Sequence, residues 1–156
     1  MGLLENIHHE TVSQLPLREA LLVSADESIR AAISTMKSKQ LGCVIVVDGD
    51  KKPLGTFTER SVVDLLAEDP QALNTATVGE HLDPKWTCVL EREPVFAVLK
   101  GMQVEDVRFV VVLNDSGETI ALAGQRGLME YVAEHYPQQV MVQRVGSKPP
   151  ADREGA

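Results

Sequence analysis

The apolar residues of this chain follow two spacings that occur twice in the same order. The first spacing is i, i+3, i+4, i+7, which puts apolar side chains on one face of a helix and so predicts two amphipathic helices. These helices carry Ile29, Ala32, Ile33 and Met36 in one case and Val95, Val98, Leu99 and Met102 in the other. The second is a continuous apolar run, at 43–47 and again at 109–113. Both runs are too short and too β-branched for helices, and they predict buried strands.

Further elements surround each helix and strand. Apolar segments at 20–23 and 87–90 predict a strand before each helix, and segments at 54–58 and 120–123 predict a strand after each polar turn. A second amphipathic helix then follows in each case. Ser24 and Glu27 have the spacing of a capping box for the first helix, and Pro94 suits the first turn of its counterpart. The predicted unit is β-α-β-β-α, which places the chain in the α/β class (α+β by some schemes).

The two units are copies of one another. A shift of 66 residues aligns 11–70 with 77–136 without a gap, and 11 of the 60 pairs are identical. One such unit leaves much of its surface exposed, so the two repeats are expected to pack together with pseudo-two-fold symmetry. Outside them, 1–10 is an N-terminal segment with a short helix, 71–76 is a connector, 137–145 holds a possible added strand, and 146–156 is expected to be disordered.

Composition and motifs argue against several classes of function. The formal net charge is −8, the opposite of what a protein that wraps nucleic acid needs. The longest apolar runs are far shorter than a membrane span. Two cysteines, Cys43 and Cys88, both in apolar stretches, indicate small core residues and a reducing, cytoplasmic compartment. The sequence contains no nucleophile elbow, P-loop or dinucleotide fingerprint, so we expect no enzyme activity.

This arrangement resembles a tandem pair of CBS domains, named after the cystathionine β-synthase domain. The likeness covers about residues 11–136 and is strongest at Leu54-Gly55-Thr56-Phe57-Thr58-Glu59-Arg60-Ser61, where a strand enters the last helix of the first repeat. The second repeat keeps only the arginine of this junction, Arg126. The resemblance implies a non-catalytic regulatory module that senses AMP, ADP, ATP or S-adenosylmethionine between the repeats, forms a homodimer, and passes the signal to a client protein.

The resemblance also implies a ligand site, mainly at the first repeat. Thr58 and Arg60 would hold phosphate, because a helix N-terminus and a cation both favour anions. The strand around Gly42, Cys43 and Val44 would read the adenine. A weaker second site would involve Phe109 and Arg126. The family's junction aspartate, which accepts bonds from both ribose hydroxyls, is replaced by Ser61 in one repeat and by Gly127 in the other. Ser61 is expected to bind one ribose hydroxyl, and Gly127 can bind none.

Simpler explanations of the same residues remain open. Thr58 is also a favourable N-cap without any ligand, and Arg60 and Arg126 could pair with carboxylates. Two adjacent histidines, His8 and His9, do not have the spacing of a metal site, and we expect no bound metal. If both ligand sites are degenerate, the protein would instead be a dimerisation module or scaffold that binds no nucleotide.

Overall fold

Each repeat forms a three-stranded sheet in the computed structural model, which describes residues 2–137. In the first sheet β1 (Leu22–Val23) lies parallel to β2 (Cys43–Val47), which pairs antiparallel with β3 (Pro53–Thr58). The second sheet repeats this order with β4 (Cys88–Leu90), β5 (Phe109–Leu113) and β6 (Thr119–Gly124). The predicted fold of two β-α-β-β-α units is confirmed. The strand predicted within 137–145 and the tail at 146–156 lie outside the described residues.

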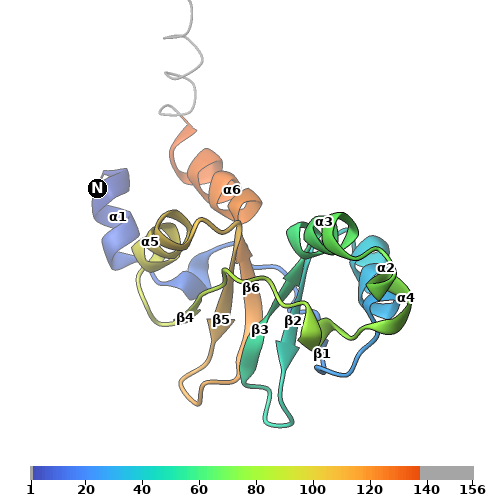
Figure 1. Ribbon diagram of the computed structural model, residues 1–156. Helices are drawn as coiled ribbons and strands as arrows, with labels where there is room; N and C mark the ends of the chain where they lie inside the picture. Colours follow the sequence, from blue (N-terminus) through green and yellow to red (C-terminus); the bar gives the residue numbers. More distant parts are fainter. Residues whose placement is uncertain (1, 138–156) are drawn as a thin grey trace, which may run out of the picture.

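The helices lie outside and above the two sheets (Figure 1). In that view β3 and β6 occupy the middle, with α3 and α6 above them. Beside the first sheet are α2 and α4, and beside the second are α1 and α5. Their bounds are Leu3–His9 for α1, Ile29–Lys39 for α2, Glu59–Glu68 for α3, Ala72–Thr75 for α4, Val95–Glu105 for α5 and Gln125–His135 for α6.

The register of the sequence repeat extends to backbone detail. Both long strand pairs shift register near the hairpin, at Val46/Val47 and at Val112/Leu113. Both α2 and α5 end on a residue in the left-handed conformation, Gln40 in one case and Asp106 in the other. Such a residue closes a helix and turns the chain back toward the sheet. Asp106 is thereby held at the edge of the space between the repeats.

One local prediction was wrong. The N-cap of α2 is Ser28, whose hydroxyl accepts a hydrogen bond from the Ala31 amide, and not Ser24. Ser24 instead donates to Asp26 in a turn before the helix, so the helix is shorter than the apolar stripe with its supposed cap suggests. The predicted connector contains the short helix α4, which packs on α2.

The first residues of each repeat, which we call its leading segment (11–18 in the first repeat and 77–85 in the second), pack against the other repeat. The Val12 amide, at the start of a 3-10 turn (Val12–Gln14), donates to the Glu93 carbonyl of the second repeat. The matching turn (Val78–Glu80) starts at Val78, whose amide donates to the Glu27 carbonyl of the first repeat. Each apolar core therefore includes residues from the other repeat's leading segment. Residues 78–83, which belong to the second repeat by register, thus lie against the first.

Candidate functional site

The N-terminus of α3 is closed by its own side chains. The Thr58 hydroxyl accepts a hydrogen bond from the Ser61 amide at 3.3 Å, and the Ser61 hydroxyl accepts one from the Thr58 amide at 3.0 Å. This reciprocal capping box satisfies two backbone donors that a helix start otherwise leaves open. Ser61 is only 4% exposed. Its hydroxyl serves the cap and is turned away from the surface.

A buried carboxylate lies beside this cap. The Thr58 hydroxyl donates to Oδ2 of Asp83 at 2.7 Å, and the Lys85 amide donates to Oδ1 at 2.9 Å. The backbone of Asp83 is fixed as well, since its amide donates to the Thr56 carbonyl at 2.7 Å. Asp83 is 5% exposed. The exchange of leading segments is what carries this residue to the first repeat.

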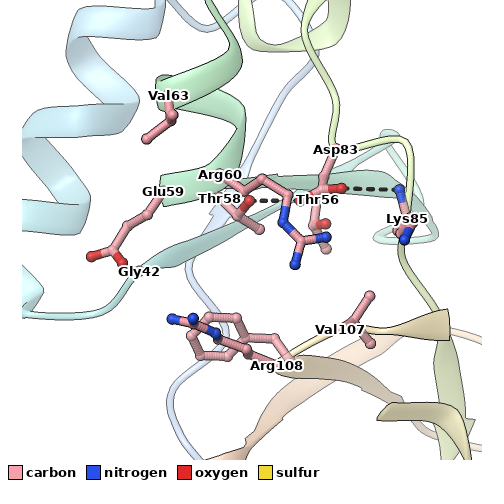
Figure 2. A pocket seen from close by; sticks show the side chains of 11 residues that line it. Gly42, Thr56, Thr58, Glu59, Arg60, Val63, Asp83, Lys85, Val107 and Arg108 are labelled. Atoms are coloured by element: carbon pink, nitrogen blue, oxygen red, sulfur yellow. Dashed lines mark hydrogen bonds between the residues drawn. The ribbon is translucent and has the colours of Figure 1, made fainter. Parts of the chain in front are cut away.

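Asp83 and Thr58 form part of the wall of a cavity of about 350 Å³ between the repeats (Figure 2). That volume is at the lower end of the range typical of small-molecule sites. The first repeat contributes one side of the cavity, together with Asp83 and Lys85 from the leading segment of the second repeat. The start of β5 contributes the opposite side. The lining residues are Gly42, Thr56, Thr58, Glu59, Arg60, Val63, Asp83, Lys85, Val107, Arg108 and Phe109.

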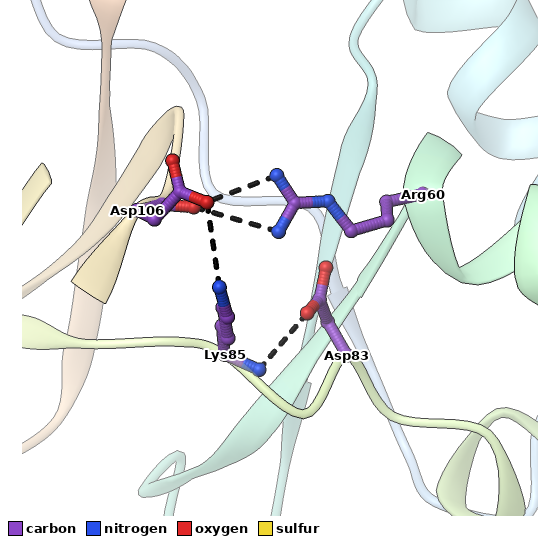
Figure 3. Close-up of polar contacts among 4 residues, drawn as sticks. All are labelled: Arg60, Asp83, Lys85 and Asp106. Atoms are coloured by element: carbon purple, nitrogen blue, oxygen red, sulfur yellow. Dashed lines mark hydrogen bonds and ion pairs between the residues drawn. The ribbon is translucent and has the colours of Figure 1, made fainter.

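Three cations line the cavity, Arg60, Lys85 and Arg108. Two of them, Arg60 and Lys85, contact Asp106 at the end of α5 (Figure 3). The Lys85 ammonium lies 3.3 Å from the Asp106 carboxylate, and the Arg60 guanidinium donates two long hydrogen bonds, 3.4 and 3.5 Å, to its carbonyl. Because the Lys85–Asp106 pair is largely exposed, it is worth at most about 1 kcal/mol. An anion entering the cavity can therefore replace Asp106 at little cost.

Of the three strand residues predicted at this site, one lines the cavity and two have their side chains in the apolar core. Gly42 lines the cavity, and a side chain on it would lie 2.9 Å from Cδ of Glu59, so glycine lets that side chain fold across the strand. The side chains of Cys43 and Val44 are fully buried in the first core. Burial raises the pKa of the Cys43 thiol to about 12, and the nearby Asp83 charge adds to the rise. At neutral pH Cys43 is a neutral core residue and not a nucleophile.

Sequence comparison identifies the family. The sequence model of the CBS domain matches residues 12–68, which include the first sheet, α2, α3 and most of the polar side of the cavity. The second repeat has the same elements in the same order and sheet topology. The first repeat is therefore a CBS domain, and the second repeat has the same fold. No functionally curated protein matches it in a sequence search.

Solved CBS-domain structures have the same fold. The CBS domain protein PAE2072 from Pyrobaculum aerophilum, complexed with AMP, superposes with a TM-score of 0.68 at 20% identity, covering 88% of this chain and 100% of that one. The CBS domain pair of protein MJ0100, in complex with 5'-methylthioadenosine and S-adenosyl-L-methionine, gives 0.70 at 18% identity, covering 80% and 97%. The CBS-domain protein ATU1752 from Agrobacterium tumefaciens gives 0.64 at 24% identity, covering 73% and 89%.

In the second CBS repeat the position that corresponds to Ser61 is Gly127, and there is no room for a side chain on it. A Cβ atom on Gly127 would lie 2.5 Å from the Pro16 carbonyl oxygen, so the exchanged leading segment fills the space that a junction side chain needs. Arg126 is exposed and its guanidinium lies 3.4 Å from Glu130, four residues along α6. Phe109, which the sequence associated with this second site, lines the first cavity. The structure therefore brings Phe109 together with Gly42, Thr58 and Arg60, and leaves Arg126 apart.

Among the cavity residues that sequence reasoning missed are Asp83, Lys85 and Arg108. The repeat register assigns Asp83 to the second repeat, so no motif in the sequence connects it with Thr58. Within residues 2–137 no group of three His, Cys, Asp or Glu side chains could hold a metal ion. His8 instead stacks on Phe96, with ring centroids 4.4 Å apart. None of the described helices has the length and hydropathy to cross a membrane.

Proposed function

We propose that this protein is a non-catalytic regulatory module that binds an adenosine nucleotide in the cavity of its first CBS repeat. The observation that carries the proposal is that three cations and the buried carboxylate of Asp83 line the same cavity. Cations favour a phosphate, whereas a carboxylate is an acceptor for neutral hydroxyl groups. A sugar phosphate has both groups, and the apolar side chains of Val63, Val107 and Phe109 offer a surface for a flat base.

The ligands of structurally similar CBS proteins support the nucleoside part of this proposal. PAE2072 is complexed with AMP, and MJ0100 with 5'-methylthioadenosine and S-adenosyl-L-methionine. These three compounds share an adenosine moiety and differ in the charge of the group attached to it. The cations of the cavity favour AMP, ADP or ATP over a ligand that carries a sulfonium.

A thermal unfolding series with AMP, ADP, ATP and S-adenosylmethionine tests the proposal. A ligand at about 100 times its Kd stabilises the folded state by about 2.7 kcal/mol, which raises the Tm of a chain of this size by several degrees. We expect a rise of this order with at least one adenosine phosphate at millimolar concentration. Absence of a shift with all four compounds would contradict the proposal and favour the alternative, a CBS scaffold with degenerate sites.

Transmission to a client protein would run through the contacts between the repeats. Arg60 and Lys85 bind Asp106, and a phosphate would compete for the same cations. The bound and empty states would then differ in how strongly the two repeats are tied together, which shifts the population of their relative orientations. The two free thiols, Cys43 and Cys88, are in keeping with a reducing compartment such as the cytoplasm.

A homodimer is the second part of the proposal, supported by exposed apolar side chains on the two upper helices. Val63 and Leu66 of α3 are 64% and 46% exposed, and Met129 of α6 is 72% exposed. Both helices lie at the same end of the sheets (Figure 1). Exposed large apolar side chains on two helices at one end of a molecule are a reason to expect a protein interface there.

Charged substitutions on these helices test the dimer. We expect Leu66→Asp and Met129→Asp to convert a dimer to a monomer in sedimentation velocity, because an unpaired charge buried in an interface costs several kcal/mol. Val104→Asp is the matched control, since Val104 is 68% exposed and belongs to α5 rather than to either of these helices. A wild-type monomer, or equal behaviour of all three variants, contradicts the dimer through α3 and α6.

A further inference from the structure

The hydroxyl groups of a bound ribose need an acceptor that this chain does not have at the usual place. In the family the junction aspartate accepts bonds from both hydroxyls, and the corresponding residue here is Ser61. Its hydroxyl is already the acceptor for the Thr58 amide at 3.0 Å, and the side chain is buried. A single hydroxyl committed to the helix cap cannot also hold two ligand hydroxyls.

Asp83 has the free acceptor capacity that Ser61 lacks. A carboxylate offers about four lone-pair positions, and two of those on Asp83 are used, by the Thr58 hydroxyl and the Lys85 amide. None of the ion pairs formed within residues 2–137 includes Asp83. The nearby Lys85 ammonium turns instead to Asp106 (Figure 3). A nearly buried carboxylate with spare acceptor positions thus lines the cavity without an ion pair to Arg60, Lys85 or Arg108.

We infer that Asp83 accepts the hydrogen bonds of the ribose hydroxyls. In this protein the acceptor would thus lie in the leading segment of the second repeat and not at the start of α3. This inference rests on the proposed nucleotide site. Thr58 is then a positioning residue, because its hydroxyl proton is directed at Asp83 at 2.7 Å and holds the carboxylate in place. The site should therefore select ribonucleotides over deoxyribonucleotides through a residue outside the family's junction motif.

Calorimetric titration with AMP, 2'-deoxy-AMP and 3'-deoxy-AMP tests the inference. A hydrogen bond to a charged acceptor contributes about 1.5–3 kcal/mol, which converts to a loss of roughly 10- to 100-fold in affinity. We expect wild type to bind at least one deoxy analogue more weakly than AMP by this factor. In Asp83→Asn the affinity for AMP should fall by a similar factor while that for the deoxy analogue changes little, so the preference nearly disappears.

Asp106→Asn is the charge-matched control, because it removes the same charge near the same cations but lies on the second repeat. It should change the affinities for AMP and the deoxy analogues together and keep their ratio. Equal binding of all three nucleotides by wild type, or an unchanged ratio in Asp83→Asn, overturns the inference and leaves the nucleotide site standing. If wild type binds none of the nucleotides, the proposed function itself fails. Should Asp83→Asn not fold, as judged by circular dichroism, Asp83→Glu takes its place, since it keeps the charge but displaces the acceptor.

Discussion

Replacing Gly127 with alanine is expected to destabilise the fold, although alanine is normally the better residue in a helix by about 1 kcal/mol. The added methyl group would lie 2.5 Å from the Pro16 carbonyl oxygen. That carbonyl cannot easily move, because two hydrogen bonds between the backbones of Arg18 and Leu122, at 2.8 and 3.0 Å, hold the segment on β6. Overpacking of this kind costs about 1–3 kcal/mol, or a Tm lower by several degrees.

Gly49→Ala is the matched control, since nothing lies within 4 Å of a Cβ atom at that turn position. Its free energy of unfolding, measured by urea denaturation, should stay within about 0.5 kcal/mol of wild type. Gly127→Asp should be worse than the alanine variant, because it adds a charge in a buried place without a partner. Restoring the family's aspartate to the second repeat would thus unfold the protein before it created a site. A Gly127→Ala variant at least as stable as wild type would contradict the packing described here.

The repeat could be predicted from sequence because it depends on local patterns. Apolar spacing within 11–70 and 77–136 determines which face of each helix and strand is buried, and the elements observed in the two units share that register. Helix ends were harder to predict, because Ser24 and Ser28 are both acceptable caps and only the chain path selects one. The motif at Thr58 and Arg60 was visible because its residues are close together in the chain.

The remainder of the site depends on contacts that no linear pattern contains. Asp83 reaches Thr58 only because the leading segment of the second repeat crosses to the first. Gly127 looks like a lost ligand residue in the sequence, whereas its close approach to Pro16 explains it as a packing requirement. In both cases the missing information is the exchange of segments between repeats. In this protein each junction lies beside the other repeat's leading segment.

Removing both cations that bind Asp106 should produce the largest loss of ligand affinity. Arg60 and Lys85 line the cavity on the first-repeat side, and each charge-assisted bond to a phosphate contributes about 1.5–3 kcal/mol. We expect Arg60→Gln combined with Lys85→Gln to weaken AMP binding by roughly 100-fold or more in calorimetric titration. The combination Lys37→Gln with Lys100→Gln is the matched control, because it changes the net charge equally on exposed faces of α2 and α5.

The Asp106→Asn variant should have the opposite effect on the same measurement. Asparagine tolerates the left-handed conformation that Asp106 adopts, so the end of α5 is kept while the competing carboxylate is removed. Since the exposed Lys85–Asp106 pair is worth at most about 1 kcal/mol, AMP should bind up to about fivefold more tightly. The gain should shrink at high salt, where exposed charges are screened. Weaker AMP binding in Asp106→Asn would mean that Asp106 positions the cations for the ligand and does not compete with it.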